Sequence, residues 1–307
     1  MRALGARAWG RALGTGVARA RIAEVWRAAR AGGLVLHTHR NLELLAALGL
    51  RALGRGVRVV WTRHAAGRPG RWTALLARRA DARVTLTAEG ARTLGLPSVV
   101  VPHGVDLRAF APPGDRAAAW AALGVGGERG VAVVGRIRPA KGQGDAVAAL
   151  ARVLPGATAW RGVLVGAARG ADRPWIAALL PLAQGRVTVV GEQPDVRPWY
   201  QGATVVVQPS RGESYSLVLA EAMASGCCVV AARLPHYRAW IDDGRTGFTY
   251  PPGDAAALAD VLAPLLASPG RAEAVGRAAA EAARTLFPLE RELAALETIY
   301  RGAGVPG

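Results

Sequence analysis

Two glutamates of this chain, Glu213 and Glu221, lie in a stretch that joins two apolar runs, residues 203–207 and residues 227–231. Short apolar runs bounded by loops predict buried strands. Between these strands the sequence predicts a loop that carries Glu213 and then a short helix that carries Glu221, with Ser216 as its N-cap. The unit is therefore strand, loop, helix, strand, with one carboxylate on the loop and one on the helix.

The surroundings of these carboxylates favour the binding of sugar and phosphate. Apolar neighbours on the helix leave Glu221 only partly exposed, and such a carboxylate requires hydrogen-bond donors, which the vicinal hydroxyls of a sugar supply. The N–H groups that follow Ser216, beginning with Leu217, offer an anion site at the helix N-terminus. The alternative is a surface helix with two solvated glutamates, which the spacing taken alone favours.

A second loop, residues 135–142, carries fixed positive charge directly after an apolar run. Gly135 lets the backbone approach a ligand closely. Arg136 offers two parallel donors to a diphosphate, and Lys141 adds a compact point charge. Lys141 is the single lysine among the 39 lysine and arginine residues, which favours a specific use of it. A basic surface turn is the alternative for this loop.

Predicted strands and helices alternate along the whole chain, which indicates parallel sheets covered by helices. Strands are expected at 34–37, 57–61, 84–86, 98–101, 131–134, 162–166, 186–191, 203–207 and 227–231. Helices are expected at 42–53, 72–79, 88–94, 116–123, 172–182, 234–241, 255–267 and from 271 onward, with a break near 287–288. Ligands of parallel sheets bind beyond the carboxyl ends of the strands. At those ends fall His37, His39, Arg40, His64 and His103.

Composition limits the class of protein. The chain has 307 residues, of which 51% are hydrophobic, and this is enough for two domains with sizeable cores. No apolar stretch approaches the roughly 20 residues of a membrane span. The two cysteines are adjacent on an expected core strand and indicate no disulfide framework. A net charge of +17 favours anionic partners such as nucleic acid, acidic lipid or phosphorylated substrates.

The two loops together resemble the family-4 glycosyltransferases. Ser210-x-x-Glu213, then seven residues, then Glu-Ala-Met-Ala-x-Gly from Glu221 resembles the donor site of that family, although serines stand at 214 and 216 where the family often has glycine. Residues 135–142 match its Gly-Arg-x-x-x-x-Lys-Gly motif. Further motifs resemble the lipopolysaccharide core mannosyltransferases of this family, namely Arg40-Asn41, Pro112-Pro113 and Trp199-Tyr200.

The resemblance implies an α/β protein of the GT-B fold, in which two Rossmann-like domains with parallel sheets face each other across a cleft. We expect an acceptor-side domain over 1–112, a nucleotide-sugar-binding domain over 113–286, and a C-terminal helix over 287–307 that returns toward the first domain. The family opens with a strand and a glycine-rich turn, whereas the first strand expected here is at Leu34 and residues 1–33 indicate basic helices. We therefore expect a truncated first domain, or a start upstream of Met1.

The resemblance also implies an activity, the transfer of a hexose with retention from a nucleotide diphosphate sugar to a glycan or lipopolysaccharide-core acceptor, with mannose from GDP-mannose favoured. It implies that Arg136 and Lys141 stabilise the diphosphate, that Glu221 holds the ribose, and that Glu213 contacts the sugar. His64 would face the reacting sugar. The implied donor-binding residues are Gly135, Arg136, Lys141, Ser216, Leu217 and Glu221, the catalytic ones His64, Glu213, Arg136 and Lys141, and the acceptor-side ones Arg40 and His103.

The chain has no Asp-x-Asp motif and no His/Cys cluster with metal spacing, so we expect a metal-free reaction and no cofactor. Expected partners are the donor and an anionic glycolipid or saccharide acceptor. The expected location is the cytoplasm, and peripheral contact with the inner face of the cell membrane stays open. Two alternatives remain: another two-Rossmann enzyme, such as a nucleotide-sugar epimerase or a phosphorylase, and a non-enzymatic basic module that binds nucleic acid. No nucleic-acid motif is visible, so no nucleic-acid partner is expected.

Overall fold

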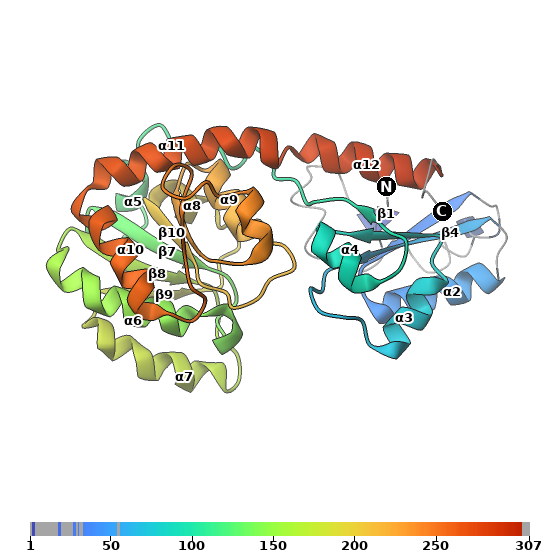
Figure 1. The fold of residues 1–307 in the computed structure, drawn as a ribbon, viewed down its shortest axis with the longest axis horizontal. Helices are drawn as coiled ribbons and strands as arrows, with labels where there is room; N and C mark the ends of the chain where they lie inside the picture. Colours follow the sequence, from blue (N-terminus) through green and yellow to red (C-terminus); the bar gives the residue numbers. More distant parts are fainter. Residues whose placement is uncertain are drawn as a thin grey trace. The chain divides into compact units, whose positions relative to one another are not determined.

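The computed structural model describes residues 2–3, 18–19, 27–28, 30, 33–53 and 56–302. These residues form two compact units (Figure 1). The described residues up to Asp106, together with those from Leu289 onward, make the first unit, and Leu107–Pro288 makes the second. Both units are α/β and each is built on a parallel sheet, as the sequence predicts.

The second unit holds a six-stranded sheet in the order β12-β11-β10-β7-β8-β9, with every pair parallel. Its strands are β7 (Arg129–Val134), β8 (Trp160–Val165), β9 (Val187–Gly191), β10 (Val205–Gln208), β11 (Cys228–Ala232) and β12 (Phe248–Tyr250). Its α-helices are α5 (Arg116–Ala121), α6 (Gln143–Val153), α7 (Asp172–Leu179), α8 (Arg197–Gly202), α9 (Leu217–Ala224), α10 (Ala255–Ala267) and α11 (Pro269–Leu286). Four 3-10 helices lie at Pro139–Lys141, Leu154–Gly156, Leu180–Ala183 and Pro235–Ala239.

Continuous apolar runs form the central strands of this sheet because both of its faces are covered by helices. Val205, Val206 and Val207 of β10 are fully buried, as are the residues of β11 beside them. Helices α6 and α10 pack together, α9 packs with α11, and α5 packs with α8 (Figure 1). The sheet therefore holds the ends of β7 and β10 as neighbours, and the loops that follow these two strands carry the residues of interest.

The first unit holds a four-stranded parallel sheet in the order β3-β4-β5-β6. Its strands are β3 (Leu34–Thr38), β4 (Val57–Arg63), β5 (Ala82–Thr85) and β6 (Val99–Val100), and its helices are α2 (Asn41–Leu53), α3 (Arg71–Arg78), α4 (Ala88–Leu94) and α12 (Leu289–Arg301). Alternate residues of β4 serve opposite faces. Val59 packs with α2 and α3, whereas Val60 packs with Ile299 of α12.

Three sequence-based expectations of local structure need correction. The expected helix at 234–241 is the shorter 3-10 helix Pro235–Ala239. The expected helix at 172–182 ends at Leu179 and continues as a 3-10 turn with Pro181 at its start, because proline has no N–H to donate to an α-helix. The 1–33 region was expected to hold basic helices and no strand. Within the described part of it, β1 (Arg2–Ala3) and β2 (Ala18–Arg19) pair in parallel, while residues 27–28 and 30 are helical.

Those two strands are too short to produce any alternation of polar and apolar residues, which is why the sequence did not indicate them. They form a sheet separate from β3–β6. The rest of the prediction for 1–33 lies outside the described residues. Among the described residues, no helix combines the length and the apolar content needed to cross a membrane.

Candidate active site

The loop between β10 and α9 places the first glutamate beside the predicted diphosphate loop. Glu213 accepts a hydrogen bond from the Nζ of Lys141, and the two side chains form an ion pair in which Glu213 is 12% exposed and Lys141 27% exposed. The two residues belong to loops that follow the neighbouring strands β10 and β7. The structure therefore brings together two residues that the sequence assigned to separate tasks.

A close backbone contact holds these two loops together. Gly142 ends the 3-10 helix Pro139–Lys141 with φ +72°, and a Cβ at this position would lie 2.0 Å from the carbonyl oxygen of Pro209. Only glycine combines that conformation with that approach. Gly135, with φ +133°, gives the same loop its turn away from β7. The glycines of the motif thus set the distance between Lys141 and Glu213.

Gln208, at the carboxyl end of β10, donates hydrogen bonds to Glu213 and to Ser216. It is buried, and its Nε2 donates to Ser216 Oγ at 2.8 Å and, over a longer 3.4 Å, to Glu213 Oε1. Ser216 is the N-cap of α9, as the sequence predicts, because its Oγ accepts from the N–H of Leu219 at 3.2 Å. Sequence reasoning missed Gln208, whose polar side chain ends an otherwise apolar strand and was the signal available.

Arg136 differs from its neighbour Lys141. Its side chain is exposed and makes no hydrogen bond or ion pair with any part of the chain that the structure describes. Its carbonyl oxygen, by contrast, accepts from Gln143 Nε2 at 3.0 Å, and this holds the backbone of the loop. Arg136 is thus a charge on a fixed backbone with a side chain that is available to a ligand.

The second glutamate, Glu221, lies on α9 beside a buried tyrosine. Glu221 is half-buried on α9, and its Oε2 accepts a hydrogen bond from the hydroxyl of Tyr200 on α8 at 2.9 Å. Burial raises the pKa of Glu221 from its ordinary value to about 7, although the hydrogen bond from Tyr200 acts in the opposite direction. Burial and the nearby carboxyl of Glu221 together raise the pKa of Tyr200 well above its ordinary value, so this phenol stays a donor.

Four of the five histidines of the chain gather at the carboxyl edge of the sheet in the first unit. The rings of His37 and His39 lie 4.5 Å apart, those of His39 and His64 5.2 Å, and those of His64 and His103 are stacked at 5.4 Å. His39 Nδ1 and His64 Nε2 share a hydrogen bond of 2.9 Å. The four rings at this predicted edge thus form one continuous group, the histidine cluster: His37, His39, His64 and His103.

Burial and the neighbouring imidazoles favour the neutral forms of His37 and His64. Burial is the main cause that lowers the pKa of His37 to about 3 and that of His64 to about 4, and the neighbouring imidazoles add to both shifts. Helix α12 supplies two further contacts. Tyr300 shares a 2.6 Å hydrogen bond with His37 Nδ1, and Glu292 accepts from His103 Nδ1 at 2.8 Å.

Arg40, which the sequence places on the acceptor side, lies beside the histidine cluster on an exposed turn. Its side chain is 85% exposed, and its nearest carboxylate is that of Glu43, at 3.9 Å. The predicted site residues therefore fall into two groups, one in each unit. The first unit holds Arg40, His64 and His103, and the second holds Gly135, Arg136, Lys141, Glu213, Ser216, Leu217 and Glu221.

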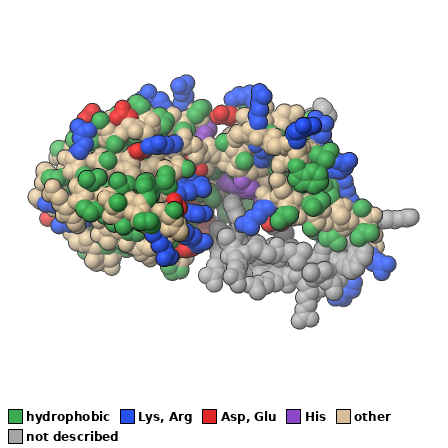
Figure 2. All heavy atoms as spheres, turned by 90° about the horizontal axis from the view of Figure 1, so that it is seen from below, with side chains coloured by type: hydrophobic (Ala, Val, Ile, Leu, Met, Phe, Trp, Pro, Cys, Tyr) green, Lys and Arg blue, Asp and Glu red, His purple; other side chains and the backbone are tan. Residues whose placement is uncertain are grey.

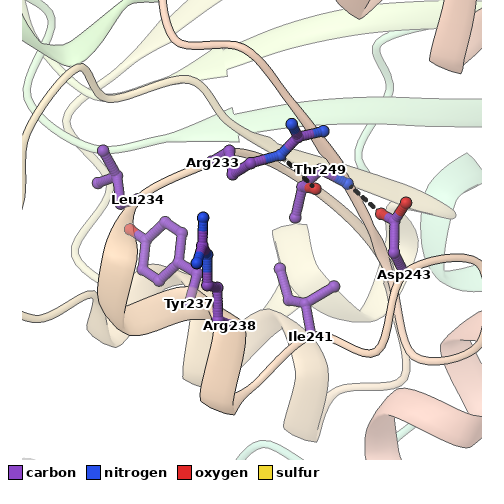
Figure 3. Close-up of a pocket in the computed structure, with 7 residues that line it drawn as sticks. All are labelled: Arg233, Leu234, Tyr237, Arg238, Ile241, Asp243 and Thr249. Carbon is purple, nitrogen blue, oxygen red and sulfur yellow. Dashed lines mark hydrogen bonds between the residues drawn. The ribbon is translucent and has the colours of Figure 1, made fainter.

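Two surface features complete the description. Arginine and lysine side chains are spread over the visible face of both units and do not form one patch (Figure 2). A pocket of about 320 Å³ on the second unit is lined by Arg233, Leu234, Tyr237, Arg238, Ile241, Asp243 and Thr249 (Figure 3). None of the predicted donor residues lines that pocket. In the portion of the chain that the structure describes, no three His, Cys, Asp or Glu side chains are grouped so that they could hold a metal ion.

The fold of the chain is that of the GT-B glycosyltransferases. Sucrose-phosphate synthase from Thermosynechococcus elongatus superposes with a TM-score of 0.75 and 26% identity, over 87% of this chain and 73% of that one. The Anabaena Alr3699/HepE structure in complex with UDP and glucose gives a TM-score of 0.76 at 21% identity, over 87% of this chain and 78% of that one. These likenesses confirm the predicted fold class.

Sequence comparison narrows the class. Residues 128–268 match the family model "Glycosyl transferases group 1". The chain is 35% identical to the lipopolysaccharide core biosynthesis mannosyltransferase LpcC of Rhizobium leguminosarum bv. viciae, over 90% of this chain and 80% of the relative. It is 30% identical to the corresponding LpsB of Rhizobium meliloti, over 87% of this chain and 78% of the relative. The chain belongs to the group 1 glycosyltransferases, and the predicted resemblance to the lipopolysaccharide core mannosyltransferases is confirmed.

Proposed function

We propose that this glycosyltransferase moves mannose from GDP-mannose to a saccharide of the lipopolysaccharide core, with retention of the anomeric configuration and without a metal ion. The observation that supports it most is the contact between Lys141 and Glu213, because it joins a cation suited to a diphosphate and a carboxylate suited to a sugar at one sheet edge. Both relatives, at 35% and 30% identity, are named as lipopolysaccharide core mannosyltransferases, which supports the choice of mannose and of the acceptor.

In this proposal the second unit, corresponding to the expected domain 113–286, holds the donor. Lys141 and Arg136 stabilise the charge that grows on the departing diphosphate, which is electrostatic catalysis. N–H groups at the start of α9, from Leu217 onward, assist them. Glu221 holds the ribose, and Glu213 contacts the sugar as it gains positive character.

The expected domain 1–112, with the helix over 287–307, serves the acceptor in this proposal. His64 faces the reacting sugar, while Arg40 and His103 lie on the acceptor side. Burial lowers the pKa of His64 to about 4, so in this proposal His64 acts at neutral pH as an uncharged hydrogen-bonding group. A neutral group suits a site that must admit both an anionic acceptor and an anionic donor.

The test is a binding screen followed by a transfer assay. Thermal unfolding of the chain is followed with GDP-mannose, UDP-glucose and an ADP-sugar, each with and without EDTA, and the product on a truncated core saccharide is analysed by NMR. We expect the largest stabilisation with GDP-mannose, no effect of EDTA on turnover, and a new α-glycoside. Preference for another donor, an inverted product, or activity that EDTA removes and Mg²⁺ restores would each contradict the corresponding part. An epimer or a sugar phosphate as the product would point to the alternative enzymes.

A further inference from the structure

Within the described residues, the side chain of Glu221, the predicted ribose carboxylate, makes one hydrogen bond, to Tyr200, and no ion pair. Tyr200 OH donates to Oε2 at 2.9 Å, and within the residues that the structure describes Oε1 makes no hydrogen bond. Tyr200 is fully buried, whereas Glu221 is half-buried. One oxygen of the carboxylate is therefore held by the protein, and the other is available to a ligand.

Arg116 of α5 binds the backbone around this pair through several hydrogen bonds. Its Nη1 donates to the carbonyl oxygens of Tyr200, Gln201 and Ala203 at 2.9, 3.0 and 2.6 Å. Its Nη2 donates to the carbonyl oxygens of Ser225 and Gly226 at 2.8 and 3.0 Å. One guanidinium thus ties the end of α8 to the end of α9, so the two side chains meet on a rigid support.

We propose that Tyr200 is a positioning residue, which holds Oε2 of Glu221 so that Oε1 is aimed at the vicinal hydroxyls of the donor ribose. This inference rests on the proposed function, since it assumes that Glu221 binds the ribose. A carboxylate on a helix can rotate about its terminal bonds, and a fixed donor on one oxygen removes that freedom before the ligand arrives. Binding of the donor then costs less ordering of the site.

The same contact sets the charge of Glu221. The titratable or charged groups around the pair are Tyr200 itself, Cys227, whose Sγ donates to the carbonyl of Tyr200 at 3.0 Å, and Arg116, which binds the same carbonyl. Helix α11 buries only apolar residues against this region. The Tyr200 hydroxyl lowers the pKa of Glu221 against the effect of burial, so its loss raises that pKa further above about 7. At neutral pH less of the carboxylate form would then be present.

The experiment compares Tyr200→Phe with Tyr250→Phe, Glu221→Gln and the double variant Tyr200→Phe/Glu221→Gln. Tyr250 is a matched control, because its hydroxyl is also buried in the second unit but makes no hydrogen bond within the described residues. Donor KM and kcat are measured with GDP-mannose, and kcat/KM is followed from pH 5.5 to pH 9. Circular dichroism and the thermal midpoint report the folding of each variant.

For Tyr200→Phe we expect a rise in donor KM of about 10-fold with kcat little changed, as for the loss of a binding contact. We expect the acid limb of kcat/KM to follow the pKa of Glu221, about 7, in the native chain and to move to higher pH in Tyr200→Phe. In the double variant Tyr200→Phe should add less than about twofold to the effect of Glu221→Gln, because the two residues act as one unit.

The outcomes separate the two claims. If Glu221→Gln raises donor KM but Tyr200→Phe behaves like Tyr250→Phe, the positioning role is wrong and the proposed function stands. Additive effects in the double variant, or an unmoved acid limb, also overturn the positioning role and assign Tyr200 to stability alone. If Glu221→Gln itself binds the donor as well as the native chain does, the ribose assignment fails first.

Discussion

The carboxyl edges of the two parallel sheets share one architecture but differ in the charged groups that they carry. In the first unit Glu43 Oε2 accepts from the N–H groups of His39 and Arg40 at 2.9 and 3.1 Å, so a carboxylate occupies the N-terminus of α2. In the second unit the N-terminus of α9 is capped by the neutral hydroxyl of Ser216. A helix N-terminus attracts anions unless a carboxylate already fills it.

The remaining side chains extend this contrast. The first edge carries the histidine cluster, in which burial and the neighbouring imidazoles lower the pKa of His37 and that of His64. The second edge carries Lys141 and Arg136, and Lys141 pairs with the loop carboxylate of Glu213. Both edges lie at strand ends, where ligands of parallel sheets bind, and our proposal assigns the diphosphate to the second edge because of its N-cap and its neighbouring charges.

Removal of Lys141 should have the largest effect. Lys141→Ala deletes a cation of the second edge, and the loss of a charge-assisted contact of about 1.5–3 kcal/mol corresponds to a fall in turnover of about 10- to 150-fold. The same range is expected for Arg136→Ala. Steady-state kinetics with GDP-mannose measures both. Arg129→Ala is the control, because it also removes one positive charge, at the start of β7, where Arg129 pairs with Glu273 at 3.5 Å. Equal losses in the control would attribute the effect to net charge.

Features of this site that depend on residues close together in the sequence were predictable, and contacts between residues far apart in the sequence were not. Strand ends and the Ser216 cap are local, and both were predictable from apolar runs and from one residue type. The pairing of Lys141 with Glu213 was not predictable, because the two residues are 72 positions apart. They meet because β7 and β10 are neighbours and because Gly142 packs closely against Pro209. The role of Arg116, which joins α8 to α9, was not predictable either, because nothing in the sequence distinguishes it from the many other arginines of the chain.

The two glutamates of the second edge should respond differently to substitution. Glu213 lies on a loop beside Lys141, where a contact can strengthen in the transition state, so Glu213→Gln should lower kcat by about 10-fold and leave donor KM near its native value. Glu221, held on its helix by Tyr200, binds equally in both states, so Glu221→Gln should raise donor KM by about 10-fold. Initial rates over a range of donor concentrations separate the two parameters. The same kinetic defect in both variants would refute this division of roles.

Acid should affect the first edge through its histidines. The folded pKa of His37, about 3, and that of His64, about 4, lie below the ordinary value near 6.5. Between these limits the unfolded chain binds more protons than the folded chain, so the free energy of unfolding falls as pH falls below about 6.5 and is unaffected by these groups above it. Thermal midpoints between pH 4 and pH 8 measure the slope. His37→Gln cannot titrate, and its curve should be flatter below pH 6.5. An identical slope in this variant would exclude the histidine as a cause.

The smallest effect concerns the two helix caps with which the comparison began. Ser216→Ala removes the acceptor for the Leu219 N–H and should lower the free energy of unfolding by about 1 kcal/mol, whereas Ser216→Gly should cost only a few tenths of that unit. Both substitutions leave the N-terminus of α9 without a carboxylate, so donor KM should rise less in either than in Ser216→Asp. Ser216→Asp should instead cap the helix and fill the anion site, as Glu43 does at the first edge, and should raise donor KM while stability is kept. Denaturant unfolding and donor kinetics on the three variants measure the two quantities separately. If Ser216→Asp bound the donor as the native chain does, the diphosphate would not lie at this helix terminus, and the contrast between the two edges would have no part in donor recognition.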